Sequence, residues 1–363
     1  MSKFIPVSEP NIGKKEEFYV LKAVRSGWVS SLGKYVEKFE KNFAKYCGRK
    51  HAASICSGTA ALHLALLALG IKKGDEIIVP NFAFIAVANA VLYVGATPVL
   101  VDSEIDTWNV DAQKIEEKIN YKTKAIIVVH TYGNPCDIDA LTNIAKKHNL
   151  FIIEDAAEAH GAEYKNKKCG SFGDVSCFSF YGNKTITTGE GGMCLTDNDD
   201  LYQKILVLRD HGMEKGKKYW HEVVGYNYRL TNLQAALGCA QLEKIEKFIK
   251  IKRKNAELYK KFLKDVPWII LPIEKPNTIN TYWMFSVLVK DKSRDLILRK
   301  LKDNGVDGRI FFYPACDMPP YKKFKSGGLD VSRKIAYSGL NLPSSTKITA
   351  EEIKYICKIL ISI

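Results

Sequence analysis

No hydrophobic run in the 363-residue sequence approaches the length that a bilayer requires. The opening residues, MSKFIPVSEP, also lack the apolar core of a secretory signal. Cysteine is present nine times, but the number is odd and no Cys-x-x-Cys pair occurs. This pattern argues against both a disulfide framework and a zinc site, and it is typical of a reducing compartment. We therefore expect a cytoplasmic protein without a metal site or membrane association.

Acidic residues are fewer than basic ones: 40 Asp and Glu face 54 Lys and Arg, which gives a formal net charge of +14. A basic balance of this kind raises the question of nucleic-acid binding. The lysines are spread along the chain, however, and no zinc-finger or RNP-like signature occurs. We expect solvated basic faces that help to attract anionic nucleotides, and no nucleic-acid partner.

The segment 151–193 contains the strongest chemical pattern. An apolar run over 150–153 ends on the two acids Glu154 and Asp155, and a second apolar run covers 175–180. Strands of α/β enzymes place charged residues at their C-terminal ends, where ligand crevices form. Asp155 is therefore a candidate for a charge in such a crevice.

Lys184 follows the second run in a loop rich in glycine and hydroxyl side chains. A lysine in this setting, preceded by a strand-end acid, suggests a Schiff-base lysine paired with a carboxylate that keeps a pyridine nitrogen protonated. The alternative is one more surface lysine. The glycines and threonines around Lys184 favour the first interpretation, since most other lysines lie among charges.

Upstream, a short apolar strand candidate is followed by Ser57-Gly58-Thr59 and a helical stretch. Free backbone N–H groups and the helix dipole make such a helix start an anion site. A serine cap with a purely structural role is the alternative. Because this turn precedes the Lys184 segment, we interpret it as a cradle for a cofactor phosphate.

Apolar strand candidates alternate with helical stretches through the first two thirds of the chain. This alternation predicts a mostly parallel sheet with helices on both faces. Apolar spacing predicts one long helix over 232–251, a strand over 280–289 and another over 309–313.

Three stretches together resemble the DegT/StrS-type sugar aminotransferases: Ser57 to Leu62, the segment 151–193, and Gly225-Tyr226-Asn227-Tyr228-Arg229. The resemblance covers nearly the whole chain. It implies an α/β chain with the aspartate aminotransferase fold (fold type I) and dependence on pyridoxal 5′-phosphate (PLP). A large domain with a seven-stranded, mostly parallel sheet is expected over 1–245, and a smaller C-terminal α/β domain over 246–363.

The resemblance also implies roles for particular residues. Lys184 and Asp155 are expected to be catalytic, with Lys184 as the PLP lysine and Asp155 on the pyridine nitrogen. Residues expected to bind the cofactor are Ser57, Gly58, Thr59, Phe84, Asp155, Glu158, Ser179, Lys184 and Asn227. Residues expected to contact the substrate are Trp28, His160, Tyr313 and Arg229. Structural roles stay open for Trp28, Phe84 and His160, as an aromatic staple or core packing.

In the resembling family the asparagine at the position of Asn227 reaches the PLP phosphate of the other subunit, which implies a homodimer with shared active sites. The implied donor is L-glutamate. The stretch FSFYGNKTITTGEGGM is most similar to members that aminate a GDP-linked 4-keto-6-deoxymannose. A UDP- or dTDP-linked keto sugar, aminated at C3 or C4, is the main alternative. A sugar dehydratase and a non-catalytic regulator are less favoured, because Lys184 and Asp155 are both present. Cys316 departs from the histidine of many relatives.

Overall fold

The computed structural model describes residues 4–214 and 216–363, built around a seven-stranded sheet with strand order β1-β9-β8-β5-β4-β2-β3. Its strands are β1 (His51–Ile55), β2 (Glu76–Pro80), β3 (Thr97–Val101), β4 (Thr123–Val129), β5 (Phe151–Asp155), β8 (Val175–Ser179) and β9 (Gly192–Thr196). Only β9 runs antiparallel to its neighbours β1 and β8, and the other pairs are parallel. The predicted mostly parallel sheet of seven strands is confirmed.

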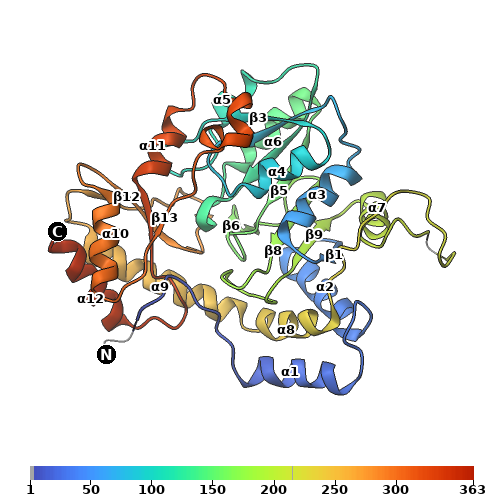
Figure 1. Cartoon of the computed structure of the whole chain (residues 1–363), viewed down its shortest axis with the longest axis horizontal. Helices are drawn as coiled ribbons and strands as arrows, with labels where there is room; N and C mark the ends of the chain where they lie inside the picture. Colours follow the sequence, from blue (N-terminus) through green and yellow to red (C-terminus); the bar gives the residue numbers. More distant parts are fainter. Residues whose placement is uncertain (1–3, 215) are drawn as a thin grey trace.

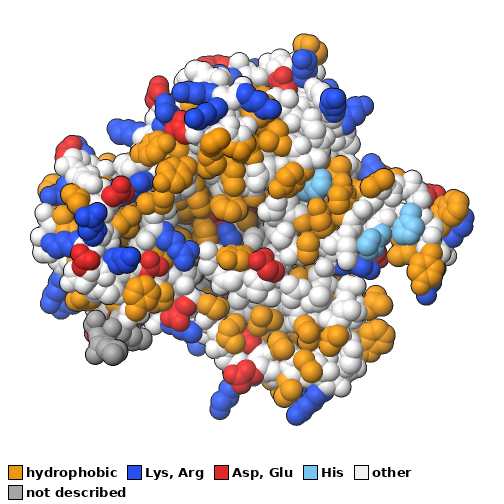
Figure 2. All heavy atoms as spheres, in the orientation of Figure 1, with side chains coloured by type: hydrophobic (Ala, Val, Ile, Leu, Met, Phe, Trp, Pro, Cys, Tyr) orange, Lys and Arg blue, Asp and Glu red, His pale blue; other side chains and the backbone are white. Residues whose placement is uncertain are grey.

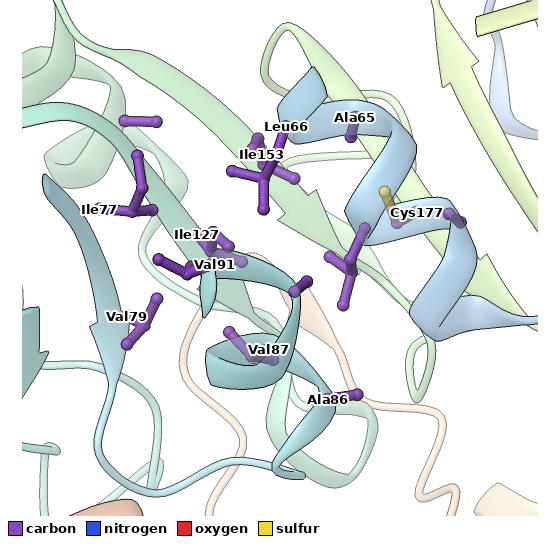
Figure 3. Packing of buried hydrophobic residues seen from close by; sticks show 14 of the residues in the cluster. Ala65, Leu66, Ile77, Val79, Ala86, Val87, Val91, Ile127, Ile153 and Cys177 are labelled. Atoms are coloured by element: carbon purple, nitrogen blue, oxygen red, sulfur yellow. The ribbon is translucent and has the colours of Figure 1, made fainter. Parts of the chain in front are cut away.

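Helices cover both faces of the sheet. Successive residues of a strand point to opposite sides, and apolar side chains on both sides need to be buried. Ile77 and Val79 of β2 join one buried cluster (Figure 3). Ile78, between them, joins another. The first face is covered by α3 (Gly58–Ala68), α4 (Ala86–Tyr93) and α7 (Asp199–Arg209). The second face is covered by α2 (Lys34–Cys47), α5 (Ala112–Glu116), α6 (Ile138–His148) and α8 (Asn232–Leu242). No helix within 4–214 and 216–363 is long and apolar enough to cross a membrane.

The C-terminal part has its own antiparallel sheet of four strands, ordered β10-β12-β14-β13. These strands are β10 (Ile269–Ile270), β12 (Phe285–Val289), β13 (Arg309–Ile310) and β14 (Gly339–Leu342). They accompany α9 (Ile245–Leu263), α10 (Arg294–Asp303), α11 (Asp330–Ser338) and α12 (Ala350–Ile361), most of which lie together at one end of the molecule (Figure 1). A separate apolar cluster fills this part. The predicted boundary at 245/246 falls just before α9 and stays a prediction.

The remaining elements connect or flank these two parts. They are α1 (Lys14–Arg25), the three-stranded sheet of β6 (Glu163–Tyr164), β7 (Lys167–Lys168) and β11 (Thr278–Ile279), and the 3₁₀ turns η1 (Thr131–Gly133), η2 (Ala315–Asp317) and η3 (Pro319–Phe324).

The N-terminal segment ahead of α1 runs along the C-terminal part before it returns to the large sheet. Ile5 forms a parallel bridge with Val306. The Ser8 hydroxyl then donates to the carbonyl oxygen of Asn183 at 3.2 Å, directly before Lys184. The following helix α1 packs against α8 (Figure 1). This segment therefore contacts both parts of the molecule.

The prediction of one helix over 232–251 is wrong. The backbone leaves the helical conformation at Lys244, with φ −113° and ψ 0°, so α8 and α9 are separate helices. The break has a packing reason. α8 is buried against α1 and α2, whereas α9 packs against α12 of the C-terminal part.

The strand predicted over 280–289 is confined to β12, which begins at Phe285. Tyr282 has φ +49°, a left-handed conformation that cannot continue a strand. The strand predicted over 309–313 is likewise reduced to Arg309–Ile310. The irregular residues before β12 carry Trp283 into the cavity described next.

Candidate active site

A cavity of about 360 Å³ lies where the ends of β4, β5 and β8 meet the start of α3 and the C-terminal part. The face shown in Figure 2 is hollowed near its centre and bordered by hydrophobic side chains. Eight of the predicted site residues line the cavity: Ser57, Gly58, Thr59, Phe84, Asp155, Glu158, Ser179 and Lys184. The parallel strands bring residues far apart in sequence to one edge.

The start of α3 forms one wall of the cavity. Ser57 caps the helix, and its Oγ accepts from the Ala60 N–H at 3.1 Å. A Cβ at Gly58 would lie only 2.8 Å from the Cβ of Ser179, so glycine lets the helix approach the end of β8 this closely. None of the described hydrogen bonds uses the N–H of Gly58 or Thr59. These N–H groups at a helix start, with the Ser179 hydroxyl beside them, suit a phosphate.

Lys184 enters the cavity from the loop after β8. Its Nζ lies 3.9 Å from Oε1 of Glu158 and 3.7 Å from the centroid of the Trp283 ring. Burial lowers the pKa of Lys184 below its ordinary value, while the carboxylates of Glu158 and Asp155 oppose that effect. An amine under these conditions exchanges its proton more readily than a surface lysine does.

Two buried carboxyl groups face Lys184. Asp155 ends β5, and its Oδ1 accepts from the Ala157 N–H at 3.0 Å. Glu158 follows in the next turn, and its Oε2 accepts from the Tyr132 N–H at 2.8 Å. Burial raises the pKa of Asp155 and raises the pKa of Glu158 to about 7. Both groups retain acceptor capacity for a ligand that carries a proton.

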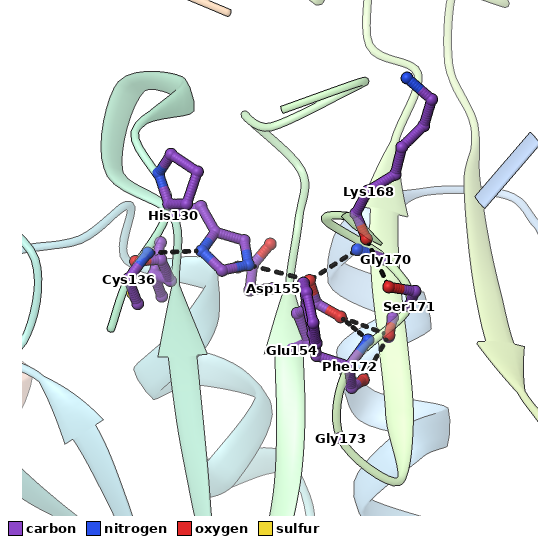
Figure 4. Close-up of polar contacts among 12 residues, drawn as sticks. His130, Cys136, Glu154, Asp155, Lys168, Gly170, Ser171, Phe172 and Gly173 are labelled. Atoms are coloured by element: carbon purple, nitrogen blue, oxygen red, sulfur yellow. Dashed lines mark hydrogen bonds and ion pairs between the residues drawn. The ribbon is translucent and has the colours of Figure 1, made fainter. Parts of the chain in front are cut away.

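The neighbouring Glu154 points to the opposite face of the sheet, where it is the centre of a polar network (Figure 4). It accepts from His130 Nε2 at 2.9 Å, from the Gly170 and Phe172 N–H groups at 2.6 and 2.9 Å, and from Ser176 Oγ at 2.7 Å. His130 Nδ1 accepts from the Cys136 N–H, so Nε2 of the neutral ring is the donor to Glu154. With its donors supplied by the chain, this cluster is a structural support for the end of β5.

The geometry agrees with a comparison of whole sequences. A model of the DegT/DnrJ/EryC1/StrS aminotransferase family matches residues 10–361. The chain belongs to this family.

Individual members of the family are similar over nearly their full length. The chain is 46% identical over 357 residues to the GDP-perosamine synthase of Escherichia coli O157:H7, covering 98% of this chain and 97% of the relative. It is 44% identical over 357 residues to that of Vibrio cholerae, with 97% of each chain covered. The PLP form of the putative sugar aminotransferase Spr1654 from Streptococcus pneumoniae superposes with a TM-score of 0.93, at 28% identity, covering 99% of this chain and 98% of that one. The predicted fold is confirmed, and the chain is a PLP-dependent sugar aminotransferase.

The residues of this family member fit PLP. The cradle at Gly58 offers unused N–H groups for a phosphate, and Asp155 offers a buried acceptor for a protonated ring nitrogen. Lys184 supplies a largely buried amine to the same cavity. PLP carries a phosphate for the N–H groups, a ring nitrogen for the carboxylate and an aldehyde for the amine.

His160 does not reach the cavity of this aminotransferase, so the predicted substrate contact is wrong. Its side chain is fully buried, with the rings of Phe178 and Phe180 at 5.2 and 5.6 Å. Burial lowers the pKa of His160 to about 3. The physical reason lies in the chain direction after β5, since the turn that presents Glu158 to the cavity directs His160 into the core.

Four other predicted residues lie outside this cavity within the chain. Asn227 is exposed, and its Oδ1 accepts from Arg229, which also pairs with Asp210 at 2.8 Å. Trp28 is exposed on the loop before α2. Tyr313 is exposed beside Tyr337, one residue after the cavity-lining Phe312. The predicted contacts of these four residues stay predictions.

Several cavity residues of the sugar aminotransferase were not predicted. Tyr132 follows β4, so the strand-end rule that indicated Asp155 could also have found it. From the large-sheet part the cavity is also lined by Leu62, Ala86, Val129, Ala157, Tyr181, Asn183 and Glu190. A further group belongs to the C-terminal part: Trp283, Met284, Arg309, Ile310, Phe312 and Asn341. No local signal places the residues of the C-terminal part, because their approach depends on how the two parts pack.

Proposed function

We propose that this sugar aminotransferase transfers the amino group of L-glutamate to a GDP-linked 4-keto-6-deoxymannose and so forms GDP-perosamine. The observation that carries the chemistry is the largely buried Lys184 amine, which faces Asp155 and Glu158 in one cavity. The sugar and nucleotide are supported by the names of the 44–46% identical relatives.

The chain's own residues divide the work of the reaction. PLP, when bound, supplies an aldehyde carbon for the amine and a conjugated ring that accepts an electron pair. Lys184 would hold the cofactor, and its free Nζ would move the proton of the donor's α-carbon. Asp155 would keep a proton on the pyridine nitrogen. Ser57, Gly58, Thr59 and Ser179 would hold the phosphate.

Two further residues act at the edge of the same cavity. Glu158, with its pKa near 7, can hold or release a proton beside Lys184 at neutral pH. Phe84 lies at the cavity wall with its ring 5.6 Å from that of Phe312, and it would cover one face of the cofactor ring.

The assembly that we propose is a homodimer with shared active sites. Asn227 is exposed and does not line its own cavity, although the neighbouring Tyr228 carbonyl pairs with the Cys56 N–H beside the α3 cradle. Large apolar side chains are exposed near this segment, among them Trp28, Leu32 and Val224. Asn227 of the partner subunit would complete each phosphate site.

The shared site is tested by subunit exchange between two inactive variants, Lys184→Ala and Asn227→Ala. A mixed dimer has one site with both lesions and one with neither, so activity should return to a fraction of the native value. As the control, each variant alone is taken through the same exchange procedure and should stay inactive. No recovery despite demonstrated exchange would place Asn227 in its own chain's site.

The substrate is tested by a coupled amination assay across GDP-, UDP- and dTDP-linked 4-keto-6-deoxy sugars with L-glutamate. We expect the highest kcat/KM with the GDP sugar and release of 2-oxoglutarate. A clear preference for a UDP or dTDP sugar would retain the aminotransferase and overturn the nucleotide assignment. Trp28, Tyr313 and Arg229 are proposed substrate contacts. In the same assay, their alanine variants should show a higher KM for the nucleotide sugar.

We also propose a cytoplasmic location. All nine cysteines are free, and eight of them are buried. Free thiols in this number suit a reducing compartment. Fractionation of cells that express the chain tests this point.

A further inference from the structure

The amine of Lys184 rests against an aromatic face. The Trp283 ring centroid lies 3.7 Å from Nζ, whereas Oε1 of Glu158 lies 3.9 Å from it. Trp283 is itself buried. The face of an indole ring carries negative charge density and attracts a cation more strongly than the rings of Tyr or Phe do.

Trp283 is held on both sides by specific contacts. Its Nε1–H donates to the carbonyl oxygen of Asn183 at 2.8 Å, in the residue directly before Lys184. The Tyr132 ring stacks on the indole, with centroids 6.1 Å apart and an interplanar angle of 26°. The position of this ring relative to Lys184 is therefore fixed from the loop that carries the lysine and from the end of β4.

A second buried lysine holds the backbone of Trp283. Lys252 Nζ on α9 donates to the carbonyl oxygen of Trp283 at 3.1 Å and to that of Ser344 at 2.8 Å. Within the described residues no carboxylate pairs with it, and burial lowers the pKa of Lys252 to about 7. A buried amine whose acceptors are two backbone carbonyls is costly to maintain, which indicates that the position of this segment matters.

We propose that Trp283 is a further catalytic residue, whose ring face holds the protonated Lys184 amine inside the cavity while the amine is not bound to the cofactor. The inference rests on the proposed role of Lys184. A carboxylate in this position could take the proton from the amine, whereas an aromatic ring stabilises the ammonium and has no site to accept its proton. The ring thus stabilises the protonated amine without competing for the proton that Nζ returns to the substrate. Lys252 acts as a positioning residue through Trp283.

Other charged groups also face Lys184 and remain constant in the test. Asp155 and Glu158 lie toward it from β5 and the following turn, and Arg309 and Glu190 line the same cavity. Burial raises the pKa of Tyr132 well above its ordinary value, so this ring stays neutral. None of these groups is altered when the Trp283 ring alone is changed.

The test measures capture of added PLP by the cofactor-free protein as a function of pH, followed by the absorbance of the lysine-bound form. In this step Nζ of the neutral amine forms a double bond to the aldehyde carbon, and the carbonyl oxygen leaves as water with both amine protons. The chain is prepared with ordinary tryptophan and with tryptophans of increasing fluorine content. Fluorine weakens the negative ring face without changing the fold.

If the ring stabilises the ammonium, each added fluorine lowers the pKa of Lys184. The midpoint of the capture profile should then fall stepwise, by about half a unit to one unit in total. Trp283→Phe is the matched control, since it keeps the other four tryptophans but carries no fluorine at this position. Its midpoint should not depend on fluorination.

A midpoint that stays constant or rises with fluorine content overturns the inference. So does a shift of equal size in the Trp283→Phe background, which would place the effect at another tryptophan. The proposed function fails in a different way, because absence of PLP capture by the native chain would remove Lys184 as the cofactor lysine. Capture with an unmoved midpoint leaves that function intact.

Discussion

Glu154 and Asp155 are adjacent on β5 and both are buried, yet their surroundings are opposite. Glu154, on the face that packs against α6, accepts four hydrogen bonds from His130, Gly170, Phe172 and Ser176. Asp155, on the face toward α3, accepts one from Ala157 and faces a cavity. A buried carboxylate without a full set of donors is costly unless a ligand supplies the rest. The comparison separates a structural acid from the acid that the proposed function assigns to the cofactor.

Among the residues near Asp155, removal of the Lys184 side chain should have the largest effect on turnover. Lys184→Ala loses the amine that Asp155 and Glu158 face, and with it both the attachment and the proton transfer. We expect turnover to fall by a hundredfold to ten-thousandfold or more. Steady-state amination kinetics measure this, with the exposed Lys167→Ala as a control of unchanged activity. Near-native turnover in Lys184→Ala would remove the catalytic assignment.

Asp155→Asn should give the next largest effect, since it keeps the shape and removes the charge. The electron-accepting ring loses its protonated nitrogen, so we expect kcat to fall by about a hundredfold or more, with a smaller change in PLP affinity. The melting temperature of the cofactor-free protein should be unchanged or higher, because a poorly compensated buried charge is gone. A kcat within a few-fold of the native value would make Asp155 an ordinary strand-end acid.

Glu154→Gln should produce the reverse pattern. The amide turns an N–H₂ group toward donors that need an acceptor, leaving about two of them unsatisfied. We expect the free energy of unfolding to fall by about 3 kcal/mol. The free energies of unfolding of Glu154→Gln and Asp155→Asn, measured side by side in denaturant, compare the two acids directly. Equal loss of stability in both variants would contradict the distinction between the two acids.

The smallest effect concerns pH. The pKa of Glu158 is raised from 4.5 to about 7 in the folded chain, so folding binds a proton between these values. The stability from this group is fully present below pH 4.5 and is lost as pH rises through 7. Relative to Glu158→Gln, the cofactor-free native chain should therefore lose about 2–4 °C in melting temperature over this window.

The comparison with Glu158→Gln is needed because another group titrates in the opposite sense. The pKa of His160 is lowered to about 3, so its contribution to stability falls as pH drops below 6.5. His160 is the same in both proteins, and its effect cancels in the difference. A difference that does not depend on pH between 4.5 and 7 would show that Glu158 is not held neutral by burial.

Much of the site could be predicted from sequence because it depends on local rules. A strand that ends on Asp155 and a helix that starts after Ser57 place their groups wherever the strands are parallel. The loop rich in glycine and hydroxyl side chains indicated Lys184, and resemblance to the family added Glu158. The error at His160 arose where no rule decided whether residues after β5 face the cavity or the core.

The contacts made by the C-terminal part could not be predicted in this way. Trp283 is about a hundred residues from Lys184 along the chain, and its backbone leaves the strand pattern only because Tyr282 is left-handed. The break at Lys244 likewise depends on α8 and α9 packing against different partners. Such features follow from tertiary packing, which periodicity along the sequence does not record.

The path of the N-terminal segment has a consequence for synthesis on the ribosome. Ile5 pairs with Val306, and the Val7 carbonyl accepts from the Ser344 N–H. The Ser8 hydroxyl donates to the Asn183 carbonyl. Elongation proceeds from the N-terminus at about 5–20 residues per second, so the first segment emerges tens of seconds before its partners. The N-terminal segment, which contacts the Lys184 loop through Ser8, therefore gains its last backbone partner only when residue 344 has left the exit tunnel. A chain that stops before residue 306 therefore lacks the partners of both Ile5 and Val7.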